Sequence, residues 1–233
     1  MTQAEQRWRV IERGFAAVAP IEPVTVAVGH DATGRRAIVS QLLHGEQATG
    51  AACLVLAGLV SPGPARRCLL LQAEDETRHA AAYRTYLSSL GGPLPPATRA
   101  VDAVRAAATW PGPPAAGPLI ANLIIESEAV RLQVRDLRSL ACPALERMHA
   151  RIAVDEARHV ALARLLLTDA LAPVGRRDRA VLWRHAQDLW WTCAEVAHEG
   201  YVPARIRRLG RPWLMARWHR VARELAAVGL NAP

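Results

Sequence analysis

Two charged pentapeptides occur 80 residues apart in the chain and contain residue types that bind metal ions. The first is Asp-Glu-Thr-Arg-His at 75–79, and the second is Asp-Glu-Ala-Arg-His at 155–159. In a helix, a Glu and a His three residues apart project from the same side, about one turn from each other. Carboxylate and imidazole together suit iron or manganese. The repeat therefore predicts two halves of one metal site.

The Glu and the His of each pentapeptide fall on the apolar stripe of their predicted helix. In the second helix this stripe includes Leu145, Ile152 and Leu166, and in the first it includes Leu69. A buried carboxylate without a neutralising partner is costly, so these groups need a cation. A pair of salt-bridged surface helices would place them on the apolar stripe for no physical reason. We therefore expect four side chains to point inward: Glu76, His79, Glu156 and His159.

The two neighbouring helices each supply one more acid on an inward stripe. Glu46 lies 30 residues before Glu76, and the midpoint falls in the turn Ser-Pro-Gly-Pro. Glu126 lies 30 residues before Glu156, and the midpoint falls in the turn Ala-Cys-Pro. Two residues that are equally far from a shared turn lie side by side in a helical hairpin. The four acids are therefore predicted to share one level of the fold.

Four carboxylates at one level carry a formal charge of about −4, which two divalent cations cancel. Six protein ligands do not fill two coordination shells, so positions remain open for oxygen or water. Glu128 is the alternative to Glu126 as the ligand from this helix, but the residue 80 positions before Glu128 is Ala48, which has no carboxylate. We therefore choose Glu126. We expect two iron ions, with manganese or a mixed manganese–iron pair as the alternative. The predicted ligands are Glu46, Glu76, His79, Glu126, Glu156 and His159.

The elements that must position these residues are predicted to be helical. Segments rich in Ala, Leu, Arg and Glu alternate with Pro and Gly. Helices are expected at about 3–14, 31–60, 65–90, 118–140, 143–172, 176–199 and 212–228, with an extended or loop segment before 31 and a long connection over 91–118.

A short turn, a long crossover and another short turn form the connectivity of a four-helix bundle with one long connection, as in ferritin-like folds. The prediction is a single all-α domain over 1–233. Its bundle core covers about 31–172, and a C-terminal helical extension covers about 176–229.

Through the two pentapeptides and the symmetric acids, the region 35–170 resembles the ferritin-like diiron carboxylate superfamily. That superfamily includes diiron oxygenases, ribonucleotide reductase small subunits, rubrerythrins and bacterioferritins. The resemblance implies that all four glutamates are catalytic and that Glu76 and Glu156 bridge the metals. It implies one iron on Glu46, Glu76 and His79, and the other on Glu126, Glu156 and His159.

The resemblance also implies partners around the ligands. Asp75 would hydrogen-bond His159 and Asp155 would hydrogen-bond His79, which fixes the tautomer of each imidazole. Arg78 and Arg158 resemble the charge partners of these aspartates. Tyr83 follows His79 by four residues and is expected beside the site, either as a core tyrosine or at the position of a radical tyrosine.

The resemblance implies an oxidoreductase that activates O2 to hydroxylate, N-oxygenate or desaturate a small organic substrate, with an external electron donor. A ferroxidase or a rubrerythrin-like protein for peroxide or iron is the alternative, and a helical protein with a structural metal is a third. The chain has no C-terminal cysteine quartet, and its length suits neither a cage-forming ferritin nor a reductase subunit. Gly50 and Ala51 leave room for a substrate or serve helix packing.

Composition limits the partners. The net charge is +8, but the chain contains no lysine, so we attribute the arginine excess to compositional bias and expect no nucleic acid. The absence of lysine also excludes a Schiff-base lysine and a Walker A motif. No apolar run is long enough to span a bilayer, and no secretory signal is recognisable. We therefore expect a soluble cytoplasmic protein, which could form a homodimer.

Three further features of the sequence give weaker evidence about function. The four cysteines lack C-x-x-C spacing and are expected to be buried free thiols. Glu195 and His198 form a third Glu-x-x-His, for which a seventh ligand is the alternative to a surface role. The segment 205–223 holds seven arginines and two tryptophans. We expect it to dock its Trp/Leu face on the bundle with arginine outside; membrane or nucleic-acid binding is the alternative.

Overall fold

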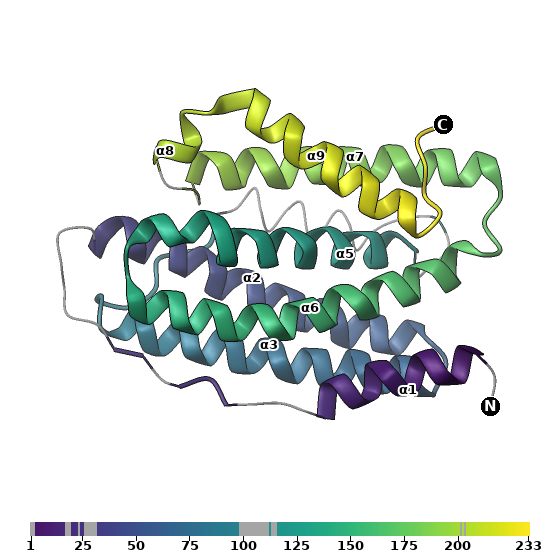
Figure 1. Ribbon diagram of the computed structural model, residues 1–233, viewed down its shortest axis with the longest axis horizontal. Coiled ribbons are helices and arrows are strands. Elements are labelled where there is room, and N and C mark those ends of the chain that lie inside the picture. The colour runs from purple at the N-terminus through teal and green to yellow at the C-terminus, as the bar shows by residue number, and fades with distance from the viewer. Residues whose placement is uncertain are drawn as a thin grey trace.

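The structure is a computed structural model in which the described residues form helices and no strand (Figure 1). The all-α class is therefore confirmed. Most of the predicted connection over 91–118, and of the segment before 31, lies outside the described residues. The described residues are 3–16, 20–22, 24–25, 32–97, 112, 116–200, 202 and 204–233.

Four helices form the centre of the fold as two hairpins. In the first hairpin α2 (Ala32–Leu59) packs along α3 (Pro64–Ser88), and in the second α5 (Ala116–Arg131) packs along α6 (Pro143–Leu171). The hairpins meet where α3 contacts α6 and α2 contacts α5. Both ends of each of these helices lie within a few residues of the predicted bounds, apart from the C-terminal end of α5.

Each hairpin turn contains one residue with positive φ, a conformation that the sequence explains for Gly63 but not for Ala141. Gly63 precedes α3 with φ 155° and ψ −163°, a conformation that glycine adopts without steric cost. Ala141 lies in the left-handed region with φ 48° in the other turn. A proline then occupies the first turn of each following helix, where its missing N–H is not needed. The turns therefore fix where Glu46 faces α3 and where Glu126 faces α6.

The prediction of one continuous α-helix over 118–140 is wrong for the second half of that range. The α-helix ends at Arg131, a π-helical turn follows over Leu132–Asp136, and a 3-10 turn covers Leu137–Leu140. A π-turn inserts one extra residue and rotates the side chains that follow it. Both Gln133 and Asp136 are consequently buried in this turn.

The apolar core has two parts with the predicted acids between them. One part contains Leu56 of α2 and Leu69 of α3 and continues into the C-terminal helices. The other part contains Leu43 of α2 and Tyr83 of α3. Since Glu46, Glu76 and His79 occur between these positions in the chain, the buried polar layer separates two apolar layers.

The remaining helices cover this bundle from two sides. α1 (Gln3–Ala16) packs on α3 and α6, whereas α7 (Arg176–Gly200) packs on α5 (Figure 1). After the short α8 (Ala204–Arg207), α9 (Gly210–Ala227) returns along α7. Trp218 of α9 lies 5.5 Å from Trp183 and 5.6 Å from Trp190, ring centroid to ring centroid. The tryptophan face of α9 is therefore packed inward as predicted, but against α7 of the extension rather than directly against the four central helices.

Candidate metal centre

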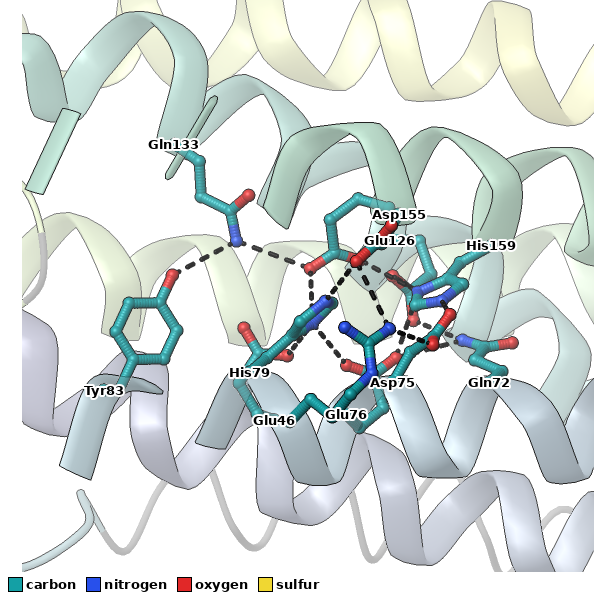
Figure 2. Close-up of polar contacts among 12 residues, drawn as sticks. Glu46, Gln72, Asp75, Glu76, His79, Tyr83, Glu126, Gln133, Asp155 and His159 are labelled. Carbon is teal, nitrogen blue, oxygen red and sulfur yellow. Dashed lines mark hydrogen bonds and ion pairs between the residues drawn. The ribbon is translucent and has the colours of Figure 1, made fainter. Parts of the chain in front are cut away.

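The structure brings all six predicted ligands together at one level of the bundle. Figure 2 labels five of them: Glu46, Glu76, His79, Glu126 and His159. α2 and α5 each supply one glutamate, while α3 and α6 each supply a glutamate and a histidine. All six are buried, and Glu46 is the most exposed at 7%. They form two groups of four whose ligand atoms lie within 4.8 Å of one another: Glu46, Glu76, His79 and Glu156 in one, and Glu76, Glu126, Glu156 and His159 in the other. Glu76 and Glu156 belong to both groups.

In the first group, the Nδ1 atom of His79 faces the carboxylates. It lies 3.3 Å from Glu76 Oε2, 3.4 Å from Glu46 Oε2 and 3.7 Å from Glu156 Oε1. This arrangement places one nitrogen and oxygens of three carboxylates around a single point, as a cation requires.

The second group repeats the first around His159. Its Nδ1 atom lies 3.1 Å from Glu76 Oε1, 3.2 Å from Glu156 Oε2 and 3.5 Å from Glu126 Oε2. The two imidazole rings are 5.9 Å apart between centroids. The ligand set is therefore close to two-fold symmetric, with one glutamate from each hairpin shared between the halves.

Each imidazole turns its other nitrogen toward an aspartate of the opposite hairpin. His159 Nε2 lies 3.0 Å from Asp75 Oδ2, and His79 Nε2 lies 3.3 Å from Asp155 Oδ2. This is the crossed pattern that the resemblance implied. A proton held on Nε2 by the aspartate leaves the lone pair of Nδ1 directed at the glutamates.

Arginines bind the outer side of both aspartates. Arg158 Nη2 lies 2.6 Å from Asp155 Oδ1 and 3.3 Å from Asp75 Oδ2. Arg78 pairs with Asp75 and approaches Asp155 at 3.5 Å, and Arg151, which sequence reasoning missed, lies 3.1 Å from Asp155 Oδ1. Burial acts to raise the pKa of Asp155, but His79 and the arginines outweigh it and lower that pKa to about 2. The aspartates are therefore held ionised.

The pKa values of the four glutamates are shifted in opposite directions. Burial acts to raise the pKa of each, but at Glu76 and Glu156 the hydrogen bonds and the nearby His159 charge outweigh it and lower the pKa. Burial, and then the nearby Glu156 carboxylate, raise the pKa of Glu46 and of Glu126 well above the usual range. Burial alone would lower the pKa of both histidines, but the surrounding carboxylates raise the pKa of each well above its usual value. Positive charge is therefore strongly favoured at the centre of this cluster.

This donor set fits two metal ions. Among the described residues no arginine pairs with any of the four glutamates; the arginines bind only the outer aspartates. The four glutamates and neutral imidazoles carry a formal charge of about −4, which two divalent cations cancel. Hard oxygen donors mixed with imidazole nitrogen suit iron or manganese.

Two buried glutamines touch the glutamates, and sequence reasoning assigned a role to neither. Gln72 donates through Nε2 to Glu126 Oε1 at 2.8 Å and to Glu76 Oε1 at 3.3 Å. Gln133 donates through Nε2 to Glu156 Oε1 and to the Tyr83 oxygen, both at 3.4 Å. Gln72 was recognisable on the inward stripe, one turn before Glu76. The position of Gln133 depends on the π-turn, which the sequence does not reveal.

The aromatic neighbours differ between the two halves. Tyr83 is fully buried next to the His79 half, and burial with the nearby Glu46 and Glu156 charges raises its pKa well above the usual value. Its ring meets the edge of His149 with centroids 5.8 Å apart. Phe15 of α1 stacks on His159 instead, at 5.9 Å and 14°. One half is therefore bordered by polar rings and the other by a phenyl ring.

A cavity of about 230 Å³ ends on the four glutamates. Its opposite wall comes from the C-terminal extension, through Trp190 and Ala194 of α7 and Trp213 of α9. The room beside Glu46 is not at Gly50, where an added Cβ would lie 3.2 Å from the Glu76 Cβ. Helix packing therefore explains Gly50, while Gly45, one residue before Glu46, lines the cavity.

The other sequence candidates lie outside the ligand groups. Glu195 is exposed, and the His198 ring packs 5.8 Å from the Trp213 ring. Glu128 pairs with Arg131 at 2.7 Å and with Arg217. Arg217 is buried, so the expectation that the arginines of α9 all face outward is wrong for this residue. The four cysteines are free: Cys53, Cys68 and Cys142 are buried, and Cys193 is half-buried.

No protein-family model matches the chain, and no curated protein shows significant similarity to it. Within the described residues, no helix combines the length and the apolar character that crossing a membrane requires. The buried glutamates and histidines, placed so that they can hold a metal ion, are therefore the observation on which any functional conclusion depends.

Proposed function

We propose that the chain is a ferritin-like, non-haem diiron oxidoreductase that uses O2 to oxidise a small organic substrate. The single observation that supports this proposal best is the cavity that ends on the four glutamates of the two ligand groups. A closed structural site would have no such space beside its ligands. A dinuclear donor set with a mostly apolar chamber next to it suits oxidation of a bound molecule.

The glutamates and histidines are the residues that would hold the metals. Glu76 and Glu156 belong to both groups, so they would be the ligands shared by the two metals, and one further glutamate and one histidine would complete each half. Two iron ions held there would supply the two-electron chemistry that the reduction of O2 needs. For hydroxylation or N-oxygenation, one substrate molecule, O2, two electrons and two protons give the oxygenated product and one water. The electrons come from an external reductant.

The surrounding residues orient the ligands and exclude water. Asp75 and Asp155 keep the Nε2 protons on the two histidines, so that both Nδ1 atoms remain available. Gln72 and Gln133 donate to glutamate oxygens and restrict the movement of those carboxylates. Trp190 and Trp213 of the extension contribute large apolar side chains to the lining of the chamber.

The alternative, a ferroxidase or a rubrerythrin-like protein, needs a route by which iron or peroxide reaches the centre. The cavity wall opposite the glutamates is made mainly of apolar side chains such as Trp190, Ala194 and Val202. Such a wall offers few oxygen ligands to a hydrated cation. This lining favours an organic substrate over iron as the molecule that enters.

The experiment compares metal content and O2 consumption in wild type, Glu76→Ala and Glu74→Ala. Wild type is expected to hold about two iron ions per chain, and to consume O2 when a chemical reductant is added. Glu76→Ala removes an oxygen ligand from both groups and should lose both metals. Glu74, two residues earlier in the same helix, is exposed, so Glu74→Ala should behave as wild type.

Retention of both metals by Glu76→Ala contradicts the assigned ligands. Continuous turnover of added iron(II), with product iron accumulating far beyond two ions per chain, favours the ferroxidase. Full metal content without O2 consumption indicates a structural metal site.

A further inference from the structure

Apart from the four glutamates of the ligand groups, the charged residues that line the cavity are Glu128 and Arg217, and their charges are compensated. Arg217 Nε lies 2.6 Å from Glu128 Oε2, and the same guanidinium also pairs with Asp136 of the π-turn. Arg131 lies 2.7 Å from the other oxygen of Glu128. Two cations thus meet two anions, so these side chains offer no uncompensated charge to an ionic ligand. Beyond them, the far wall is mainly apolar.

The size of the cavity sets a second limit. Its volume of about 230 Å³ lies below the range of about 300–1,000 Å³ that is usual for drug-sized ligands. Such a chamber suits a compact molecule, and a bicyclic ring system is small enough to enter it.

Gln133 lines this cavity and carries one buried polar atom that is unsatisfied. The residue is 2% exposed. The Glu156 carboxylate can only accept, so the amide nitrogen must face it, and Figure 2 shows this nitrogen directed to Tyr83 and the oxygen turned away. Within the described part of the chain, Gln133 Oε1 has no hydrogen-bond partner. A buried acceptor without a donor is unfavourable, and a ligand that brings a donor relieves this.

We infer that the cavity takes a small, neutral, mainly apolar molecule that carries one O–H or N–H group, and that Gln133 Oε1 accepts the hydrogen bond from it. This inference rests on the proposed function, for which it names the substrate class. Gln133 also donates to Glu156, so the donor end of the molecule is held next to a bridging ligand. Gln133 is therefore a positioning residue that determines which end of the molecule faces the metals.

The test measures binding by calorimetry under nitrogen, with the metal content determined on the same sample. The probes are indole, indene and indole-3-carboxylate. Indole and indene have nearly the same shape, but only indole has an N–H donor. Without a protein acceptor, indole would bind more weakly than indene, because its N–H loses water without compensation. With Gln133 as acceptor, indole should bind about five-fold more tightly than indene.

Three variants assign the effect to Gln133 and to the cavity. Gln133→Met keeps the length of the side chain and removes the acceptor, so indene should now bind at least as tightly as indole. Gln72→Met is the matched control: Gln72 also donates to a glutamate but does not line the cavity, and the preference for indole should persist. Ala194→Phe fills the chamber and should abolish binding of both.

Equal binding of indole and indene by wild type overturns the inference, as does a preference for indole that survives Gln133→Met. Tight binding of indole-3-carboxylate overturns the requirement for a neutral ligand. The two proposals fail separately. Two metals and O2 consumption without the indole preference leave the proposed function standing alone, whereas the indole preference without metal uptake rejects the proposed function.

Discussion

The two halves of the site share their ligands but not their surroundings. Each hairpin supplies two glutamates and a histidine at positions offset by 80 residues, and each histidine binds the aspartate of the other hairpin. The residues that surround these ligands are not repeated 80 positions along the chain. Tyr83 corresponds to Ala163, and His149 corresponds to Leu69. The duplicated pattern therefore ends at the predicted ligands and the aspartates that orient the two histidines.

This difference separates two tasks. A two-fold ligand set suffices to bind two cations of the same charge, and the almost equal contacts of His79 and His159 reflect that requirement. The aromatic neighbours break this symmetry, because Tyr83 and His149 border the His79 half whereas Phe15 stacks on His159. In the proposed oxidation, these unpaired positions are where the two sides of the centre would differ toward a substrate.

The largest expected effect tests the symmetric part. Glu46 and Glu126 each belong to one ligand group, whereas Glu156 belongs to both. Glu46→Ala and Glu126→Ala should therefore each retain about one metal per chain, and Glu156→Ala should retain almost none. Metal analysis after gel filtration measures this. Equal losses in all three variants would show that the two metals bind as one unit, and the division into halves would then be wrong.

The sequence predicted most of the helices and the convergence of the six acidic and histidine side chains, because both depend on local spacing. A Glu and a His three residues apart share a helix face whatever lies around them, and equal distances from a short turn bring Glu46 beside Glu76. The aspartate–histidine contacts came from the resemblance and have the implied pattern in the structure.

The residues that make the halves different depend on register and on distant partners. One extra residue in the π-turn rotates Gln133 inward, and no periodic pattern in the sequence marks that insertion. Arg217 looks like part of a solvated arginine-rich face, and its partners Glu128 and Asp136 lie 89 and 81 residues away in the chain. Pairings over such separations are fixed only when α9 docks on the bundle.

The second prediction concerns the contact between the extension and the π-turn. Arg217→Met leaves Asp136 buried without this cation, and the loss of one partner of a buried ion pair costs about 3–5 kcal/mol. The free energy of unfolding, measured with urea, should fall by about that amount. Arg223→Met, on the exposed side of the same helix, is the control and should change it little. Equal effects of the two substitutions would mean that α9 is held by its tryptophans alone.

The smallest predicted effect concerns His149, whose counterpart in the other half is Leu69. Burial lowers the pKa of His149 to about 3, from an ordinary value of 6.5. Between these values the unfolded chain takes up a proton that the folded chain does not, so stability falls as the pH falls from 6.5 toward 3. The slope is at most about 1.4 kcal/mol per pH unit, which gives a loss of about 2 kcal/mol at pH 5.

The substitution His149→Leu makes this position identical to its counterpart and removes the titrating group. The acidic aspartates still titrate in the variant, so the informative quantity is the difference between variant and wild type in urea unfolding at pH 7 and pH 5. We expect His149→Leu to become more stable relative to wild type as the pH falls. The exposed His219 has no such burial, so His219→Leu should show no comparable change. A pH-independent difference for His149→Leu would mean that His149 is solvated in the folded protein, and the polar border of the His79 half would then be open to water.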